Sequence, residues 1–159
     1  GDGITAFSLP AADNSIWSLE HLLRGPRALL VFHRRDCPAC RLLLPFLERM
    51  HRRLGRAGLL VAGVSQDSHP DTLELADAFQ ITFPLLLDRP AFGLSRQCGV
   101  LEVPTQVLFD REGTALATLT GFSRREEEQL FLRLARISRA GLLLYALMLL
   151  LSFFVILPS

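Results

Sequence analysis

The sequence contains no lysine, so arginine supplies every basic side chain other than histidine. The 17 arginines stand against 16 acidic residues, which gives a formal net charge of +1. A chain with so little net charge lacks the global positive field that draws proteins to nucleic acid, and we therefore expect no nucleic-acid partner. We attribute the missing lysine to genomic bias rather than to function.

Cysteine is scarce as well, with only Cys37, Cys40 and Cys98. Three cysteines are too few for a fold held together by disulfides, and a chain of 159 residues can bury a sufficient core without them. A zinc site would need one or two further ligands at a regular spacing, whereas the four histidines are scattered along the chain. We therefore expect no metal and no cofactor.

Charged residues are absent from the last part of the sequence, where residues 141–157 read GLLLYALMLLLSFFVIL. A membrane-spanning helix needs about 20 apolar residues, with about 17 as the lower limit. We therefore predict a C-terminal membrane anchor over residues 139–159. Side chains of this anchor include Leu142, Tyr145, Leu150 and Phe154.

A signal peptide is not visible at the start of the sequence, and arginines gather before the apolar segment, at Arg133, Arg136 and Arg139. The positive-inside rule places the arginine-rich side of a span in the cytoplasm. We expect a single-pass protein of the bacterial cytoplasmic membrane, with its soluble domain on the cytoplasmic face. The periplasmic face remains the alternative, because a trimmed signal would place the domain outside.

Strand-like and helix-like segments alternate before the apolar segment. Apolar runs at 27–32 and 59–65 have the length of strands that are buried on both faces. Leucines spaced by three and four residues predict a helix over 39–56, and an amphipathic helix begins near Ser123. This order predicts an α/β domain over residues 1–138, with helices on both faces of a central sheet.

Two of the cysteines form the pattern C-x-x-C where a predicted strand ends and a predicted helix begins. Functional residues of open α/β sheets gather at the carboxyl ends of the strands. A helix N-terminus carries roughly half a positive charge, which should lower the pKa of Cys37 below the value of about 8.5 for a free thiol. We predict that Cys37 is the exposed nucleophile and that Cys40 resolves the mixed disulfide.

The approach to the cysteine pair is rich in charge. Arg34 and Arg35 should lower the pKa of Cys37 further by Coulomb attraction, whereas the neighbouring Asp36 should raise it. His33 is a candidate proton acceptor, but we favour its interpretation as a partly buried polar residue at a strand end.

Several segments together resemble the thioredoxin superfamily, and within it the redoxin and TlpA-like proteins related to AhpC/TSA. Pro45 lies five residues after Cys40, where thioredoxins carry a proline in the active-site helix. The segment GVLEVPTQVLFDREG is similar to the one that holds the cis-proline of the superfamily, at Pro104 here. The segments FSLPAADNSIWSLEHLL and GVSQDSHPDTLELADAFQITFPLLLD resemble the N-terminal hairpin and the inserted strand and helix of redoxins.

The resemblance covers residues 4–137 and implies a thioredoxin-like three-layer fold with a mixed central sheet. It also implies thiol–disulfide exchange with protein thiols and disulfides, and a cis peptide between Val103 and Pro104 that faces the cysteine pair. The sequence departs from the family pattern at Asp36, which replaces the usual aromatic residue, and at Leu43, which replaces a glutamate of TlpA-like reductases.

Three functions are compatible with these features. The first is a membrane-anchored thiol–disulfide oxidoreductase. The second is an accessory subunit of a larger respiratory or photosynthetic membrane complex, with little or no catalysis. The third and weakest is a thiol peroxidase, because Leu30 and Arg34 occupy the positions of the proline and threonine that peroxiredoxins require. Cys98 is either a small buried side chain, which we favour, or a third redox thiol.

Overall fold

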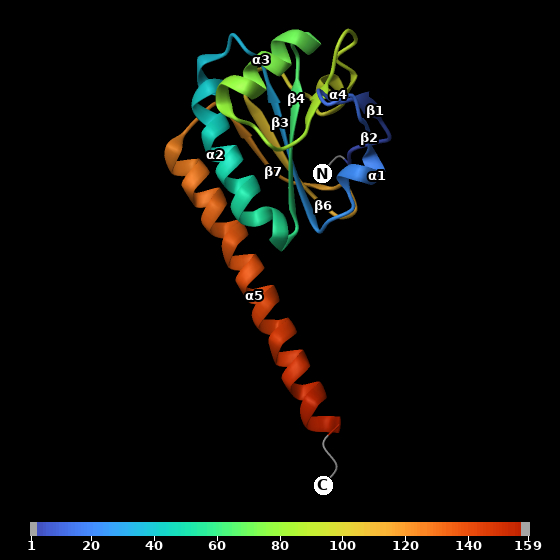
Figure 1. Ribbon diagram of the computed structural model, residues 1–159, viewed down its shortest axis with the longest axis vertical. Coiled ribbons are helices and arrows are strands. Elements are labelled where there is room, and N and C mark those ends of the chain that lie inside the picture. Colours follow the sequence, from blue (N-terminus) through green and yellow to red (C-terminus); the bar gives the residue numbers. More distant parts are fainter. Residues whose placement is uncertain (1–2, 157–159) are drawn as a thin grey trace. The chain divides into compact units, whose positions relative to one another are not determined.

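The computed structural model describes residues 3–156 of the chain. Within its last helix the side chains left undescribed are those of residues 138, 140–142, 144, 145, 148 and 152–156. The chain divides into two compact units, Gly1–Ser123 and Arg124–Ser159. Figure 1 shows a sheet with helices in the first unit and a single helix in the second. The domain boundary that we predict after residue 138 falls inside this helix and stays a prediction.

A mixed sheet of five strands forms the centre of the first unit, in the order β5-β4-β3-β6-β7. Its central strand β3 runs parallel to β4 and antiparallel to β6, and β4 runs parallel to β5. The strands are β3 (Arg27–His33), β4 (Leu59–Ser65), β5 (Leu85–Leu87), β6 (Thr105–Asp110) and β7 (Ala115–Thr120). The predicted mixed central sheet is therefore confirmed.

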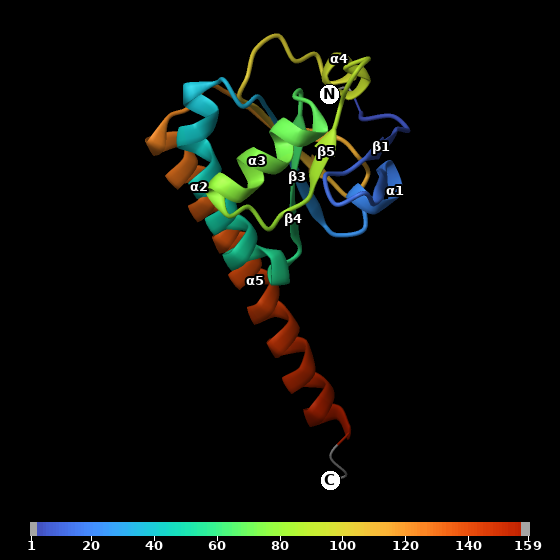
Figure 2. The ribbon, with the colours of Figure 1, turned by 45° about the horizontal axis from the view of Figure 1, so that its top comes forward.

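Helices α2 (Pro38–Leu54) and α3 (His69–Phe79) cover the same face of this sheet. Each helix connects two neighbouring parallel strands, and right-handed crossovers in one direction place both helices on one side. Figure 2 shows both helices on the same side of β3 and β4. A hydrogen bond of 2.7 Å between the hydroxyls of Ser65 and Thr72 ties α3 to β4.

Short elements cover the opposite face. They are β1 (Ser8–Pro10), β2 (Ile16–Ser18), α1 (Leu19–Leu22) and α4 (Gly93–Gln97). Leu22 and Leu94 from the two helices join a buried cluster with Leu30 and Phe32 of β3 and Val107 of β6. Helices thus lie on both faces of the sheet, as the three-layer prediction requires.

The turn after α2 depends on a glycine. A short 3₁₀ helix, Gly55–Ala57, follows α2, and its C-cap is Gly58, whose φ of 99° lies in the left-handed region. A Cβ at this position would lie 2.6 Å from Cγ of Pro26. Glycine is therefore required here both by the backbone conformation and by the lack of space.

A buried carboxylate holds the start of α4, the helix that leads to the loop before β6. Asp88 is 2% exposed. Its oxygens accept hydrogen bonds from the backbone N–H groups of Leu94 (3.0 Å) and Ser95 (2.8 Å) and from the Ser95 hydroxyl (2.6 Å).

We expect Asp88→Ala to lower the free energy of unfolding by about 2 kcal/mol, because it leaves buried donors without their charged acceptor. Asp88→Asn, which keeps one acceptor oxygen, should lose less. Urea unfolding of both variants measures the difference. A loss below about 0.5 kcal/mol for the alanine variant would contradict the prediction.

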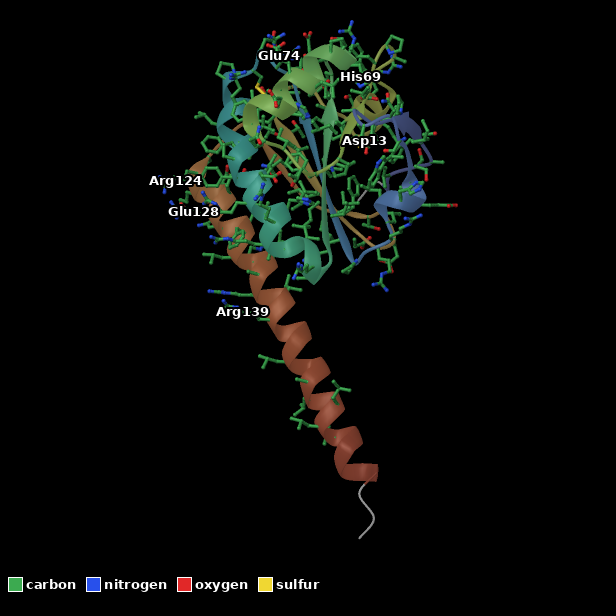
Figure 3. The ribbon with its side chains drawn as sticks, viewed as in Figure 1. Asp13, His69, Glu74, Arg124, Glu128 and Arg139 are labelled. Atoms are coloured by element: carbon green, nitrogen blue, oxygen red, sulfur yellow. A yellow bond between two sulfur atoms is a disulfide. The ribbon has the colours of Figure 1, made fainter. Side chains whose placement is uncertain are left out.

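The second unit is helix α5 (Arg124–Ile156). Arg124 and Glu128, both labelled in Figure 3, form an ion pair of 2.9 Å one turn apart. Within residues 3–156, no helix combines the length and the apolarity that crossing a membrane requires, so the predicted membrane span is not found there.

The four residues that we predict in the anchor all lie in α5. Leu150 is described, and 63% of it is exposed. The side chains of Leu142, Tyr145 and Phe154 lie outside the described part of the structure, as do residues 157–159 altogether. The role of these four residues stays a prediction.

Candidate active site

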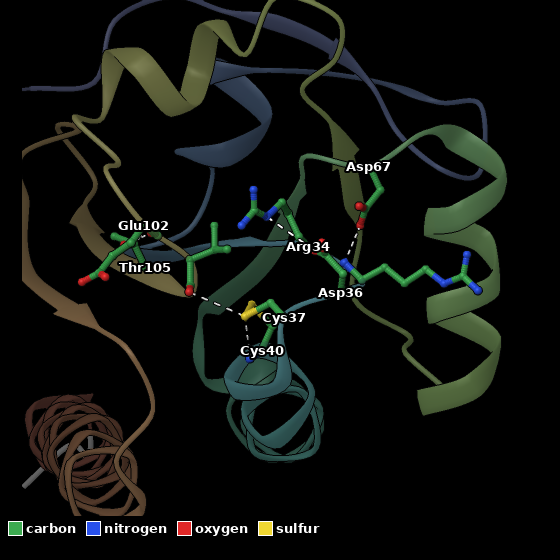
Figure 4. The surroundings of a disulfide bond; sticks show 9 residues. Arg34, Asp36, Cys37, Cys40, Asp67, Glu102 and Thr105 are labelled. Carbon is green, nitrogen blue, oxygen red and sulfur yellow. Dashed lines mark hydrogen bonds and ion pairs between the residues drawn. A yellow bond between two sulfur atoms is a disulfide. The ribbon is translucent and has the colours of Figure 1, made fainter.

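Cys37 and Cys40 form a disulfide at the start of α2, with their Cα atoms 5.2 Å apart. Strand β3 ends at His33 and α2 begins at Pro38, so the pair stands at the carboxyl edge of the sheet. Figure 4 shows the two sulfurs at the N-terminal end of the helix. The position matches the one that the sequence predicts.

Cys37 is the N-cap residue of α2. Its backbone is extended, and its Sγ accepts a hydrogen bond of 3.1 Å from the N–H of Cys40. The first N–H groups of a helix and its partial positive charge stabilise a negative charge at such an atom. In the reduced protein these contacts favour the thiolate of Cys37.

The two sulfurs differ in their access to solvent. Cys37 is 8% exposed, whereas Cys40 is 1% exposed. An incoming sulfur therefore reaches Cys37 before Cys40. This geometry agrees with Cys37 as the nucleophile and Cys40 as the resolving residue, although the oxidised Cys37 is less exposed than we expect from the sequence.

A loop before β6 lies against the disulfide. The Val103–Pro104 peptide bond is cis, as predicted. The carbonyl oxygen of Val103 lies 3.6 Å from Sγ of Cys37. The hydroxyl of Thr105 donates to the carbonyl of Glu102 at 2.7 Å, and the N–H of Gly121 donates to the carbonyl of Pro104 at 2.8 Å. Both sides of the cis bond are thus held in place beside Cys37.

The charged side chains that precede the cysteine pair form ion pairs and hydrogen bonds with other groups of the protein. Arg34 and Asp36 are exposed and pair with each other at 3.6 Å. The backbone N–H of Arg35 donates to Asp67 at 2.7 Å. Dashed lines in Figure 4 join the side chain of Arg34 to Asp36, and the carboxylate of Asp67 to the backbone of the approach loop. The sequence correctly places these charges near Cys37 but does not show that they pair with one another.

Arg35 links the approach loop to α3. Its guanidinium donates to Asp71 at 2.9 Å and to Glu74 at 2.8 Å. Burial raises the pKa of Asp67, and the N–H of Arg35 acts against that rise. Sequence reasoning did not identify these three carboxylates as part of the site, because their contacts with the approach loop depend on the fold and not on sequence spacing.

We expect Arg35→Gln to raise the pKa of Cys37 in the reduced protein by less than about one unit, because a positive charge is lost but solvent screens it. The ion pairs are partly exposed, so the loss in unfolding free energy should stay near 0–1 kcal/mol. Thiolate absorbance against pH measures the shift. Arg124→Gln on α5 is a matched control, and a lower pKa in Arg35→Gln would contradict the prediction.

His33 is 1% exposed, and in the described residues neither nitrogen of its ring has a hydrogen-bond partner. Burial lowers the pKa of His33 to about 4, so the ring is neutral near pH 7. A Cβ at Gly63 would lie 2.9 Å from Nε2 of His33, so the glycine makes room for the ring. A base this weak takes no proton from a thiol at neutral pH, which supports the interpretation of His33 as a buried residue. The ring is more completely buried than the sequence predicts.

Cys98 stands apart from the dithiol, next to α4 on the other face of the sheet. Burial, with a smaller contribution from Asp88, raises the pKa of Cys98 to about 11. The thiol stays protonated at neutral pH, which favours a packing role over a redox role. In the part of the chain that the structure describes, no three His, Cys, Asp or Glu side chains are grouped so that they could hold a metal ion.

The chain is similar to a known protein family and to known sequences. The model of the AhpC/TSA family matches residues 1–117. Thioredoxin-like protein YneN of Bacillus subtilis is 27% identical over 127 residues, which cover 77% of this chain and 73% of the relative. Thiol-disulfide oxidoreductase ResA of Geobacillus thermodenitrificans is 28% identical over 112 residues, or 68% of this chain. The chain spans only 64% of that ResA.

Solved structures show the same fold. A protein of Chlorobium tepidum, assigned as the thiol:disulfide interchange protein DsbE, has a TM-score of 0.77 and 26% identity, covering 87% of this chain and 96% of its own. Peroxidoxin BcpB of Mycobacterium tuberculosis has a TM-score of 0.74 at 20% identity, covering 86% of this chain and 96% of its own. The second likeness shows the fold alone. The chain thus has a thioredoxin-like fold and is a homologue of thiol–disulfide oxidoreductases with a C-x-x-C pair.

Proposed function

Because this chain belongs to the AhpC/TSA family, we propose that it exchanges disulfides with protein substrates through the Cys37–Cys40 dithiol. One observation carries the proposal. The disulfide lies at the N-terminus of α2 with Cys37 more accessible than Cys40. The similarity to proteins named thiol-disulfide oxidoreductase and thiol:disulfide interchange protein supports the same chemistry.

The reaction takes place in two steps. The thiolate of Cys37 attacks a substrate disulfide, so a Cys37–substrate disulfide forms and one substrate thiolate leaves. The thiolate of Cys40 then attacks Sγ of Cys37, which restores the Cys37–Cys40 disulfide and releases the second substrate thiolate. The substrate gains two electrons and the dithiol loses two. The same steps in reverse oxidise a substrate dithiol.

The positions of the two cysteines favour each step, without a separate side chain that acts as a base. The N–H of Cys40 points at Sγ of Cys37, so it stabilises the negative charge of the thiolate that begins the first step. Cys40 is held one helical turn away from Cys37. Its attack is therefore intramolecular, and no second molecule has to diffuse to the mixed disulfide. Position 43, which holds a glutamate in TlpA-like reductases, is a buried leucine here.

Disulfide reduction by the full-length chain tests the proposal. The protein is supplied with dithiothreitol as electron donor and with insulin as substrate, and its reduction potential is measured in glutathione buffers. We expect catalysed reduction of insulin above the rate with dithiothreitol alone. A folded protein that carries the disulfide and gives no such catalysis contradicts the proposal and favours the accessory-subunit alternative.

The peroxidase alternative is tested in the same preparation. The similarity to a peroxidoxin shows the fold alone, and Leu30 and Arg34 stand where peroxiredoxins need a proline and a threonine. We expect no consumption of hydrogen peroxide beyond that of the reductant. Consumption that depends on Cys37 would replace the exchange proposal by a peroxidase.

The location of the protein is a separate proposal that rests on the sequence. Residues 141–157 carry no charge and follow three arginines, which supports a position at the bacterial cytoplasmic membrane with the cysteine pair on the cytoplasmic face. Fractionation of cells that produce the full chain, with protease added from outside, tests this. Recovery in the soluble fraction, or cleavage by the external protease, contradicts it. Stable co-purification with a membrane complex would favour the accessory-subunit function.

A further inference from the structure

Leu101 is almost completely exposed, at 98%, the highest value among the large apolar side chains that the structure describes. A side chain this exposed contributes nothing to the core of the fold. It lies two residues before Val103, whose carbonyl oxygen is 3.6 Å from Sγ of Cys37. Two residues span at most about 7 Å, so Leu101 belongs to the same short loop as the carbonyl group that contacts the sulfur.

The first turns of α2 also present apolar side chains. Pro38 and Leu42 are exposed, with Leu42 at 59%. Residues four apart lie on the same face of a helix, so Pro38 and Leu42 share one face of the first turns of α2, directly after Cys37. Single exposed leucines are ordinary on protein surfaces. Here two segments that adjoin the disulfide, the loop before β6 and the start of α2, each carry an exposed leucine.

The charges around the disulfide disfavour a small anionic thiol. Arg34 is paired with Asp36, and Arg35 is paired with two carboxylates of α3. Glu102, next to Leu101, is exposed and places a further negative charge on the loop. In Figure 4 its carboxylate points away from the sulfurs. A ligand that carries carboxylates would therefore meet arginines that are already paired with carboxylates of the protein.

We propose that Leu101 is a substrate-contact residue that selects polypeptides with an apolar side chain next to the reacting cysteine. The proposal rests on the exchange function proposed above. A polypeptide that brings its sulfur to Cys37 has to pass the loop at Val103. Because extended residues are spaced by about 3.3–3.6 Å, a side chain one or two positions from the substrate cysteine reaches Leu101. An apolar side chain there removes the leucine from water.

The experiment compares the wild type with Leu101→Ser in the full-length chain. The substrates are two disulfide-linked peptides that differ only in the residue beside each cysteine, leucine in one and serine in the other, together with oxidised glutathione. Burying a leucine side chain corresponds to a factor of about 10 or more in affinity. We expect Leu101→Ser to lower kcat/KM for the leucine peptide by about 10-fold and to leave the other two substrates within about 2-fold.

Three controls accompany this comparison. Leu116→Ser on β7, where 48% of the leucine is exposed, should change no rate. Leu101→Met should retain the preference for the leucine peptide. The urea midpoint of Leu101→Ser should equal that of the wild type, because the side chain is exposed.

Each outcome decides between the two proposals. Equal rates of the wild type on both peptides, a faster reaction with oxidised glutathione, or an equal fall on all substrates in Leu101→Ser overturns the role of Leu101. A wild type that reacts with none of the three substrates overturns the exchange function itself. Retained preference in Leu101→Met together with its loss in Leu101→Ser supports the substrate contact.

Discussion

Cys37→Ser should abolish disulfide exchange, with a fall in the rate of insulin reduction on the order of 10³-fold or more. Cys37 offers the accessible sulfur of the pair, at the N-terminus of α2. In the variant the remaining thiol of the pair is Cys40, which is 1% exposed and lacks the N-cap position. Chemistry that needs a thiolate within reach of a substrate sulfur then has no group to perform it.

Cys40→Ser should behave differently, because the nucleophile is kept and the resolving step is lost. The mixed disulfide with substrate then accumulates and can be detected as a mass increase under non-reducing conditions. Cys98→Ser is the matched control and should keep full activity, since burial raises the pKa of Cys98 to about 11. Substantial activity in Cys37→Ser, or its loss in Cys98→Ser, would show that the assignment is wrong.

Stability should fall as the pH drops from about 6.5 to about 4, in part because of His33. Burial lowers the pKa of His33 in the folded protein to about 4, against 6.5 for an exposed histidine. Between these values the unfolded chain binds a proton that the folded chain does not, so protonation favours unfolding. The contribution is fully present above pH 6.5 and is lost toward pH 4. The difference of pKa corresponds to about 3 kcal/mol.

Replacing His33 by leucine should remove this part of the pH dependence. Urea unfolding at several pH values between 4 and 7 gives the free energy of unfolding for wild type and variant. We expect the gap between the two curves to change by about 3 kcal/mol across this range, whatever its size at pH 7. His69→Gln is the control, because the ring of His69 is paired with the carbonyl of Ala12. A gap that stays constant with pH would contradict the prediction.

Features that follow from local pattern were predicted well from the sequence. The apolar run at 27–32 became β3 at Arg27–His33, and the leucine spacing over 39–56 became α2 at Pro38–Leu54. Strand and helix periodicity are properties of short segments, so they can be read without tertiary contacts. The cysteine pair and the cis bond before Pro104 were identified because each belongs to a motif of a few residues.

Features that depend on side-chain direction could not be predicted. Arg35 reaches Asp71 and Glu74, which lie 36 and 39 residues further along the chain, and sequence spacing says nothing about such contacts. The exposure of Leu101 was equally hidden, since a leucine before a strand reads as part of a core. The apolar composition near the C-terminus led to the predicted membrane span, which the described residues do not contain.

Gly63 on β4 lies between the side chains of His33 on β3 and Leu85 on β5, so the residue sizes at these three positions depend on one another. A methyl group at this position would meet Cδ2 of Leu85 at 2.5 Å as well as the ring of His33. The volumes at positions 33, 63 and 85 are therefore not independent: a larger residue at one has to be balanced by a smaller one at another. Only homologues or redesigned variants that replace both the histidine and Leu85 by smaller residues free position 63 to carry a side chain.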